Sequence, residues 1–135
     1  MKRKFLYLFT IILFVSCSLD DNTTDFEIET LTIKEAIVPS EFNFGSNHNI
    51  TIIYDLPSGC HSFYELFYQY EDTARIVAVN SLVNENIACT DALIEQEFTF
   101  TVNVLQREDY IFKFWKGTDS NGENIFEEII VPVNE

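Results

Sequence analysis

The chain has 135 residues, of which 22 are acidic and 8 are basic, and its formal net charge at pH 7 is −14. This length suits one domain with a single hydrophobic core. Because so acidic a chain repels phosphate groups, the composition argues against nucleic-acid binding and against electrostatic docking on anionic lipids.

Residues 1–16 have the pattern of a secretory signal peptide. Three basic residues at 2–4 precede an apolar run over 5–15, and Ser16 closes the segment. The run is too short to cross a hydrocarbon core of about 30 Å, so we expect this segment to be removed. Its removal would leave five cations against 22 carboxylates, a formal charge of −17.

Val15, Ser16 and Cys17 resemble the lipobox of bacterial lipoproteins, although Phe14 departs from the usual Leu. The resemblance implies that the thiol of Cys17 is lipidated, with palmitate-type acyl chains, and that Cys17 becomes the first mature residue. One acyl chain holds a protein only marginally, whereas two or more anchor it stably. We therefore expect attachment to the membrane through lipid on Cys17.

Residues 17–30 are polar and acidic after the cysteine, which is typical of a solvated tether. Asp20 and Asp21 resemble the export signal of Bacteroidetes-type surface lipoproteins. That resemblance implies an outer-membrane lipoprotein exposed on the cell surface. The alternative is an ordinary acidic linker on a lipoprotein that faces the periplasm.

Residues 31–135 read as one domain of consecutive β-strands with almost no helical periodicity. The clearest strand is 97–104, in which four apolar residues alternate with four polar ones, as expected for one buried and one wet face. Turn residues separate the runs. We expect strands near 31–38, 49–56, 61–70, 74–84, 95–104, 109–116 and 125–133.

About seven short antiparallel strands at near-regular spacing favour an immunoglobulin-like β-sandwich. Glu108, Asp109 and Tyr110 resemble the tyrosine corner of such folds, which implies a buried Tyr110 ring whose hydroxyl bonds to backbone. A small up-and-down β-barrel is the alternative, although it normally has eight strands and an interior cavity.

Cys60 and Cys89 remain as a pair once Cys17 is assigned to lipid. In an exported, oxidising compartment such a pair favours a disulfide. The alternative is two free buried thiols or a redox pair, although no C-x-x-C spacing supports the latter.

The sequence predicts no catalytic residue, no metal site and no cofactor. His48 and His61 have no partners at metal-ligand spacing, and glycine-rich phosphate loops and nucleophile elbows are absent. The segment 119–123 is interpreted as an Asn-Gly hairpin turn and not as a calcium loop, because the sixth position of such a loop would be Asn124. The tripeptide 72–74, Asp-Thr-Ala, resembles an O-glycosylation acceptor of the same bacteria.

An exposed aromatic patch is the one candidate binding feature. We take alternate residues of the strand 61–70 as its core face: Tyr64, Leu66, Tyr68 and Tyr70. Strand alternation then places Phe63 and Phe67 outside, and the same rule places Ile111 and Trp115 outside on the strand 109–116. These two strands are neighbours in an immunoglobulin-like sheet. The four residues would then form one contiguous patch, a feature that tends to mark contact sites. The alternatives are that another segment covers them or that the faces are reversed.

Taken together, these features predict a lipid-anchored cell-envelope protein without catalytic activity that binds a protein or glycan partner. A structural spacer within an envelope complex is the alternative. A hydrolase would require His48 or His61 beside a carboxylate in a pocket.

Overall fold

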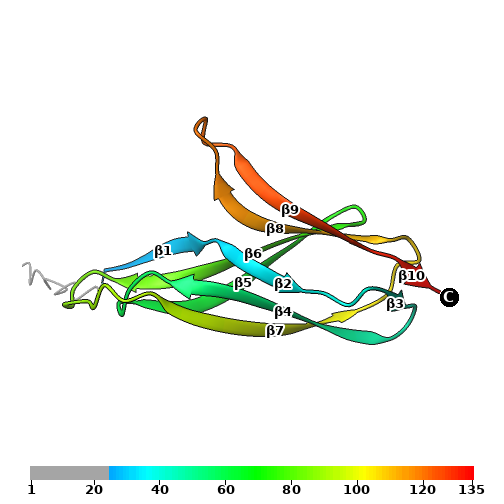
Figure 1. The fold of residues 1–135 in the computed structure, drawn as a ribbon, viewed down its shortest axis with the longest axis horizontal. Coiled ribbons are helices and arrows are strands. Elements are labelled where there is room, and N and C mark those ends of the chain that lie inside the picture. The colour runs from blue at the N-terminus through cyan, green and yellow to red at the C-terminus, as the bar shows by residue number, and fades with distance from the viewer. Residues whose placement is uncertain (1–24) are drawn as a thin grey trace, which may run out of the picture.

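The computed structural model describes residues 25–135, which form a β-sandwich without helices in this part of the chain (Figure 1). The predicted all-β sandwich is confirmed, but the number of strands is ten and not about seven. The strands are β1 (Phe26–Leu31), β2 (Ile33–Ile37), β3 (Phe42–Asn43), β4 (Asn47–Leu56), β5 (His61–Glu71), β6 (Ala74–Asn84), β7 (Ile94–Asn103), β8 (Tyr110–Thr118), β9 (Asn124–Val131) and β10 (Val133–Asn134).

One layer is a five-stranded sheet built around β6. One edge of β6 pairs with β5 over most of its length. The other edge has two partners in succession: β8 pairs with residues 74–77 and β1 pairs with residues 79–84. Strand β9 adds to the far side of β8. The pairing partner along this edge of β6 therefore changes from β8 to β1 near Ala78, and we call this point the fork.

The opposite layer is a three-stranded antiparallel sheet in the order β2-β4-β7. A short parallel pair of β3 and β10 lies at one end of the sandwich (Figure 1). Two-residue strands are too short to show a hydrophobic period, which is why the sequence did not reveal them.

The tether prediction is wrong for residues 26–30, which form most of β1 and pair with β6. Phe26 and Ile28 alternate with Glu27 and Glu29, a strand pattern that the acidic composition concealed. The expected strand 31–38 is likewise divided. After Thr32 the chain leaves the five-stranded sheet and continues as β2 in the other layer.

The five-stranded sheet also departs from the immunoglobulin-like order, in which the counterpart of β5 would pair with β8. Here β6 lies between β5 and β8, and β6 and β8 run parallel. The prediction that the strands near 61–70 and 109–116 are neighbours is therefore wrong. Local alternation fixes which face a side chain takes, but it does not fix the order of strands in a sheet.

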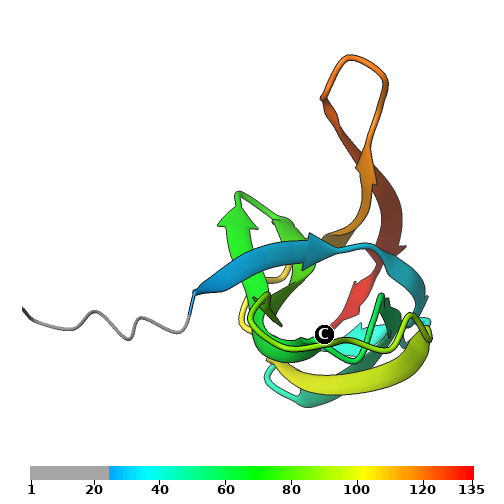
Figure 2. The ribbon, with the colours of Figure 1, turned by 90° about the vertical axis from the view of Figure 1, so that its left-hand side faces the viewer.

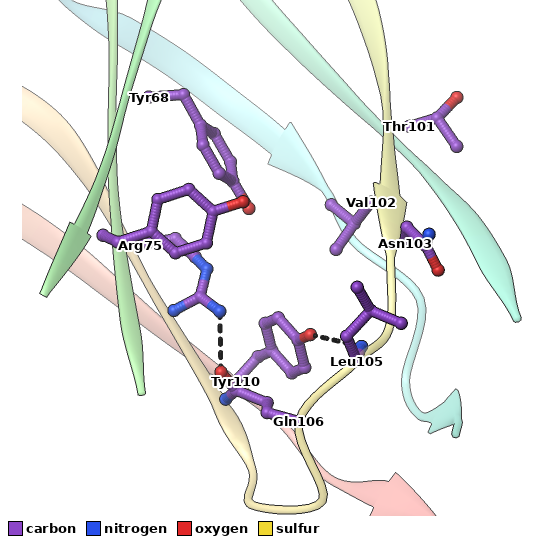
Figure 3. Close-up of a pocket in the computed structure, with 9 residues that line it drawn as sticks. Tyr68, Arg75, Thr101, Val102, Asn103, Leu105, Gln106 and Tyr110 are labelled. Atoms are coloured by element: carbon purple, nitrogen blue, oxygen red, sulfur yellow. Dashed lines mark hydrogen bonds between the residues drawn. The ribbon is translucent and has the colours of Figure 1, made fainter. Parts of the chain in front are cut away.

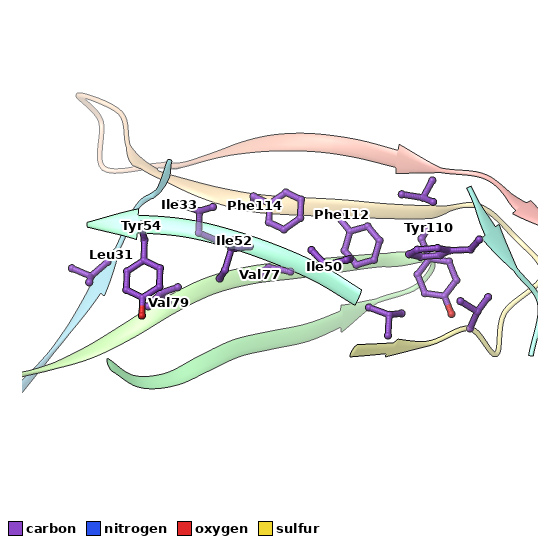
Figure 4. Close-up of a cluster of buried hydrophobic side chains, with 14 of the residues drawn as sticks. Leu31, Ile33, Ile50, Ile52, Tyr54, Val77, Val79, Tyr110, Phe112 and Phe114 are labelled. Carbon is purple, nitrogen blue, oxygen red and sulfur yellow. The ribbon is translucent and has the colours of Figure 1, made fainter. Parts of the chain in front are cut away.

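The hydrophobic core fills the space between the two layers (Figure 4). Phe112 and Phe114 are fully buried, and the Phe112 ring packs edge-on against Phe42 with centroids 6.0 Å apart. The predicted alternation in 97–104 is confirmed, since Phe98, Phe100, Val102 and Val104 all join or flank the core.

The predicted tyrosine corner is confirmed at Tyr110. Its side chain is 2% exposed, and its hydroxyl accepts a hydrogen bond from the backbone N–H of Leu105 at 3.2 Å. This contact ties the loop after β7 to the start of β8.

The predicted disulfide between Cys60 and Cys89 is also confirmed, with the two Cα atoms 5.3 Å apart. It joins the start of β5 to the long connection between β6 and β7. Gly59 N–H donates to the carbonyl oxygen of Thr90 beside it, at 2.9 Å. The disulfide therefore holds a connection that has no strand of its own.

Candidate functional site

The outer face of the five-stranded sheet brings together two of the four predicted aromatic-patch residues. Phe67 pairs with Ala78, and Trp115 pairs with Phe126. Strands β6 and β8 run parallel and Val77 pairs with Phe114. The residues that follow them, Ala78 and Trp115, therefore lie side by side. The four side chains therefore form one row across the face where β6 changes partner.

The β8–β9 hairpin rises from the body of the sandwich beyond this row (Figures 1 and 2). A groove of about 370 Å³, which we name the fork groove, lies at its base. Its lining residues come from all five strands of the sheet: Thr30, Phe67, Gln69, Ile76, Ala78, Asn80, Trp115, Asn124 and Phe126.

No lining residue of the fork groove is charged, although the chain has 22 acidic residues. The indole N–H of Trp115 donates to Asn124 Oδ1 at 2.9 Å, which fixes the ring across the hairpin. Asn80 bridges its neighbours, accepting from Thr30 Oγ1 and donating to Glu65 Oε1. The groove thus combines large apolar rings with neutral amides and a hydroxyl.

Phe63 was predicted to face outward, and the structure places it on the inner face. An extra residue at Tyr64 forms a β-bulge, because Phe63 and Glu65 pair with the adjacent residues Ser81 and Asn80. The bulge turns Phe63 to the inner face, whereas Tyr64 has no partner on β6 and is 47% exposed. Phe63 stacks on Phe98 of the opposite sheet with centroids 4.6 Å apart.

Ile111 lies on the outer face as predicted but outside the groove. It pairs with Ala74 and with Ile130, two rows from the row that holds Trp115. The prediction of one contiguous patch of four residues is therefore wrong in this respect. Lys113 occupies the intervening row and forms an ion pair with Glu71 at 2.7 Å.

Phe126 is a groove residue that the sequence analysis missed. In a regular hairpin closed by the Asn-Gly turn, Glu127 of β9 would lie opposite Trp115 of β8. A second bulge, between Trp115 and Gly117, shifts the register by one residue and puts Phe126 there instead. Gly117 adopts a φ of 111°, a conformation that favours glycine. A glycine inside the predicted strand was therefore the one sequence feature that could have indicated this bulge.

A second cavity, of about 530 Å³, opens between the edge strands β5 and β7 (Figure 3). Arg75 lines it and is 5% exposed. The guanidinium lies under the Tyr70 ring at 4.2 Å and against the Tyr110 ring at 4.9 Å. Burial raises the pKa of Tyr68, another lining residue, to about 12.

The two histidines serve local structure at separate places. His48 stacks on Phe42 and accepts from the backbone N–H of Asn43 at 3.1 Å. His61 lies between Ser58 Oγ at 2.8 Å and Glu29 Oε2 at 2.7 Å, so it does have the carboxylate neighbour that a hydrolase would require. It lines neither cavity described above. Ser58 also accepts from the N–H of Cys60, as expected for a turn serine.

No cluster of three or more metal-binding side chains occurs within residues 25–135. The Asp119 carboxylate accepts from the N–H groups of Asn121 and Glu123, as the hairpin-turn interpretation predicts. Thr73 is half-buried, and its carbonyl oxygen accepts from the Gln106 amide. Its glycosylation stays a prediction.

The predicted signal peptide, the predicted lipidation site Cys17, and Asp20 and Asp21 lie outside the residues that the structure describes. Over the described range, no helix is long and apolar enough to cross a membrane.

A search of protein-family models matches residues 50–130 to the ORF11 β-sandwich domain. The matched stretch runs from β4 into β9 and so covers most of both sheets. No curated protein matches the chain. No solved structure matches it either.

Proposed function

This chain belongs to the ORF11 β-sandwich domain family, and we propose that it is a non-catalytic binding module, anchored to the outer membrane by lipid on Cys17, that holds a neutral glycan in the fork groove. The single observation that carries the binding proposal is an uncharged, aromatic-lined groove on a strongly acidic domain.

The ligand class follows from the chemistry of the lining. A sugar ring has an apolar face, which packs on aromatic side chains such as Phe67, Trp115 and Phe126. Its hydroxyl groups need donors and acceptors at the edges of that platform, and the amides of Gln69 and Asn124 supply both. Ligand sites generally combine an apolar lining with a few placed polar groups. A carboxylate-free groove suits an uncharged sugar chain.

The spacer alternative has less support. A spacer needs no apolar groove, and its surface would be charged throughout. The outer face of the three-stranded sheet is polar and partly charged, with Thr51 bonded to Thr99 and Lys34 bonded to Asp55 and Glu95. The fork groove is the feature that a spacer does not explain.

The cell-envelope location rests on the lipobox resemblance at 15–17 and on the disulfide. A disulfide persists in exported proteins and is rare in a reducing cytosol. Asp20 and Asp21 favour the outer face of the outer membrane over the periplasmic face. The first strand of the described part is β1, so under this proposal residues 18–25 would join it to the lipid.

Binding is tested by calorimetric titration of the purified protein with neutral glucans, mannans and xylans. Trp115→Ala should abolish binding of the glycan that the natural protein holds. Ile130→Ala is the matched control, because Ile130 is 62% exposed on the same outer face but lies outside the groove. If none of the neutral glycans binds, or if both variants bind as the natural protein does, the glycan proposal fails.

The anchor is tested separately in cells. Cys17→Ser should abolish incorporation of labelled palmitate, and incorporation that survives this change would contradict the lipoprotein proposal. Replacing Asp20 and Asp21 by Ala should convert a protease-accessible protein into a protected one. Unchanged accessibility would remove the argument for surface export.

A further inference from the structure

Arg75 differs from the other cations of the domain. The remaining four, counted over residues 25–135, all form ion pairs with carboxylates: Lys34 with Asp55 and Glu95, Arg107 with Glu135, Lys113 with Glu71, and Lys116 with Glu127. Arg75 is the most buried of the five, and within the same range it has no ion-pair partner.

Neutral groups alone hold the Arg75 guanidinium. Its Nη1 donates to the carbonyl oxygens of Asp72 at 3.1 Å and Ala74 at 2.8 Å, and its Nη2 donates to Gln106 Oε1 at 2.6 Å. These bonds use three of the five N–H groups of a guanidinium. The side chain is thus fixed in place with its positive charge uncompensated.

The cavity beside Arg75 has no acidic side chain in its lining. Tyr68, Gln106 and Tyr110 lie around the guanidinium, and residues 101–103 of β7 line the cavity on its other side (Figure 3). The Tyr70 ring also lies against the guanidinium. Tyr70 and Leu105 are 69% and 71% exposed, so the cavity is open to solvent. Its volume of about 530 Å³ lies in the range of small-molecule sites, roughly 300 to 1,000 Å³.

We propose that this cavity binds a sugar that carries a carboxylate, such as a hexuronate. The guanidinium of Arg75 would take the carboxylate, and the hydroxyls of Tyr68 and Tyr70 would bond to the sugar. The exposed ring of Tyr70 would cover one face of the sugar at the opening. This site is independent of the fork groove, because alternate residues of β5 point to opposite faces of the sheet.

The positive charge of Arg75 complements a carboxylate only within the cavity, because the rest of the domain is acidic. Binding costs little further desolvation of the guanidinium, since folding has already buried it, and charge-assisted hydrogen bonds to carboxylate are the strong ones. The acidic surface of the domain opposes an anion at longer range. At physiological ionic strength that repulsion is largely screened beyond about 8 Å, so the lining of the cavity determines the affinity.

The test is calorimetric titration of the purified protein with digalacturonate and, as the matched probe, its methyl ester. The ester keeps the same sugar skeleton but replaces each carboxylate by an uncharged methyl ester. The free acid should bind at least about tenfold more tightly than the ester, which is the effect expected of a charge-assisted hydrogen bond. Equal affinities, or no binding of the acid, would overturn the proposal.

Three variants locate the site. Tyr70→Ala should weaken binding of the acid about tenfold without unfolding the domain, because this side chain is largely exposed. Arg75→Gln should remove the preference for the acid over the ester, and if this variant fails to fold, the Tyr70→Ala result still decides. Ile130→Ala should bind as the natural protein does. If Tyr70→Ala binds the acid with unchanged affinity, the acid is bound elsewhere and the assignment is wrong.

Discussion

Two substitutions on the same strand should separate a core residue from a groove residue. Phe112 is fully buried and packs against the rings of Phe42, Tyr110 and Phe114, with centroids 5.8 to 6.0 Å away. Phe112→Ala should therefore cost about 3 to 5 kcal/mol of unfolding free energy, from lost burial and an uncollapsed cavity. Trp115 lies outside the core cluster.

The cost of Trp115→Ala can be worked out from its contacts. The cross-strand pair with Phe126 contributes about 0.2 to 1 kcal/mol, and the hydrogen bond to Asn124 about 0.5 to 1.5 kcal/mol. The expected loss is thus about 0.7 to 2.5 kcal/mol, below that of Phe112→Ala. Urea unfolding followed by far-ultraviolet circular dichroism measures both, since one variant lacks the only tryptophan. Equal losses would mean that Trp115 belongs to the core, and the reasoning for a free groove would fail.

Three further changes test other parts of the fold. Replacing Cys60 and Cys89 together by Ser should lower the unfolding free energy by about 3 to 4 kcal/mol. This is the free-energy cost, from chain entropy, of closing a loop with a sequence separation of 29. Chemical denaturation that shows no loss would contradict this role. Tyr110→Phe leaves the Leu105 N–H without its acceptor and should cost about 1 to 3 kcal/mol, measured in the same way. The pKa of Tyr68 is raised to about 12 against about 10 in an unfolded chain, so from pH 10 to 12 the unfolded state loses a proton that the folded state retains. Its contribution is complete below pH 10, and stability should fall across this window by up to about 1.4 kcal/mol per pH unit. Tyr68→Phe should flatten that fall, and an unchanged alkaline profile would contradict the assignment.

Features set by local sequence could be predicted. Alternation placed β4 to β9 within a few residues, and the Phe98 to Val104 face points to the core as expected. The tyrosine corner at Tyr110 was predictable because its hydrogen bond to Leu105 spans five residues. The disulfide followed from there being a single remaining pair of cysteines.

Features set by pairing between distant strands could not be predicted. The parallel contact between β6 and β8 depends on which edge of the β5–β6 hairpin meets β8. The alternation of apolar and polar residues is the same for either edge, so it does not predict which strand pairs with β8. For the same reason, alternation could not predict that Arg75 lies beside a cavity between β5 and β7.

The composition of the fork groove depends on two bulges. The extra residue at Tyr64 turns Phe63 inward, and the extra residue at Lys116 brings Phe126 opposite Trp115. Each bulge inserts one residue, and one residue exchanges the faces of a strand. Alternation therefore placed Phe67 and Trp115 correctly on an outer face, but it did not show that Ala78 of β6 lies between them or that Phe126 completes the row.

The single tryptophan makes the fork groove directly measurable. Because Trp115 is the only tryptophan in the chain and lines the groove, its fluorescence reports on this site alone. Titrating the purified protein with the neutral glycan that it binds should produce a saturable change in tryptophan emission with the same dissociation constant as calorimetry. Calorimetric binding without any change in emission would place the glycan away from Trp115 and contradict the proposed site.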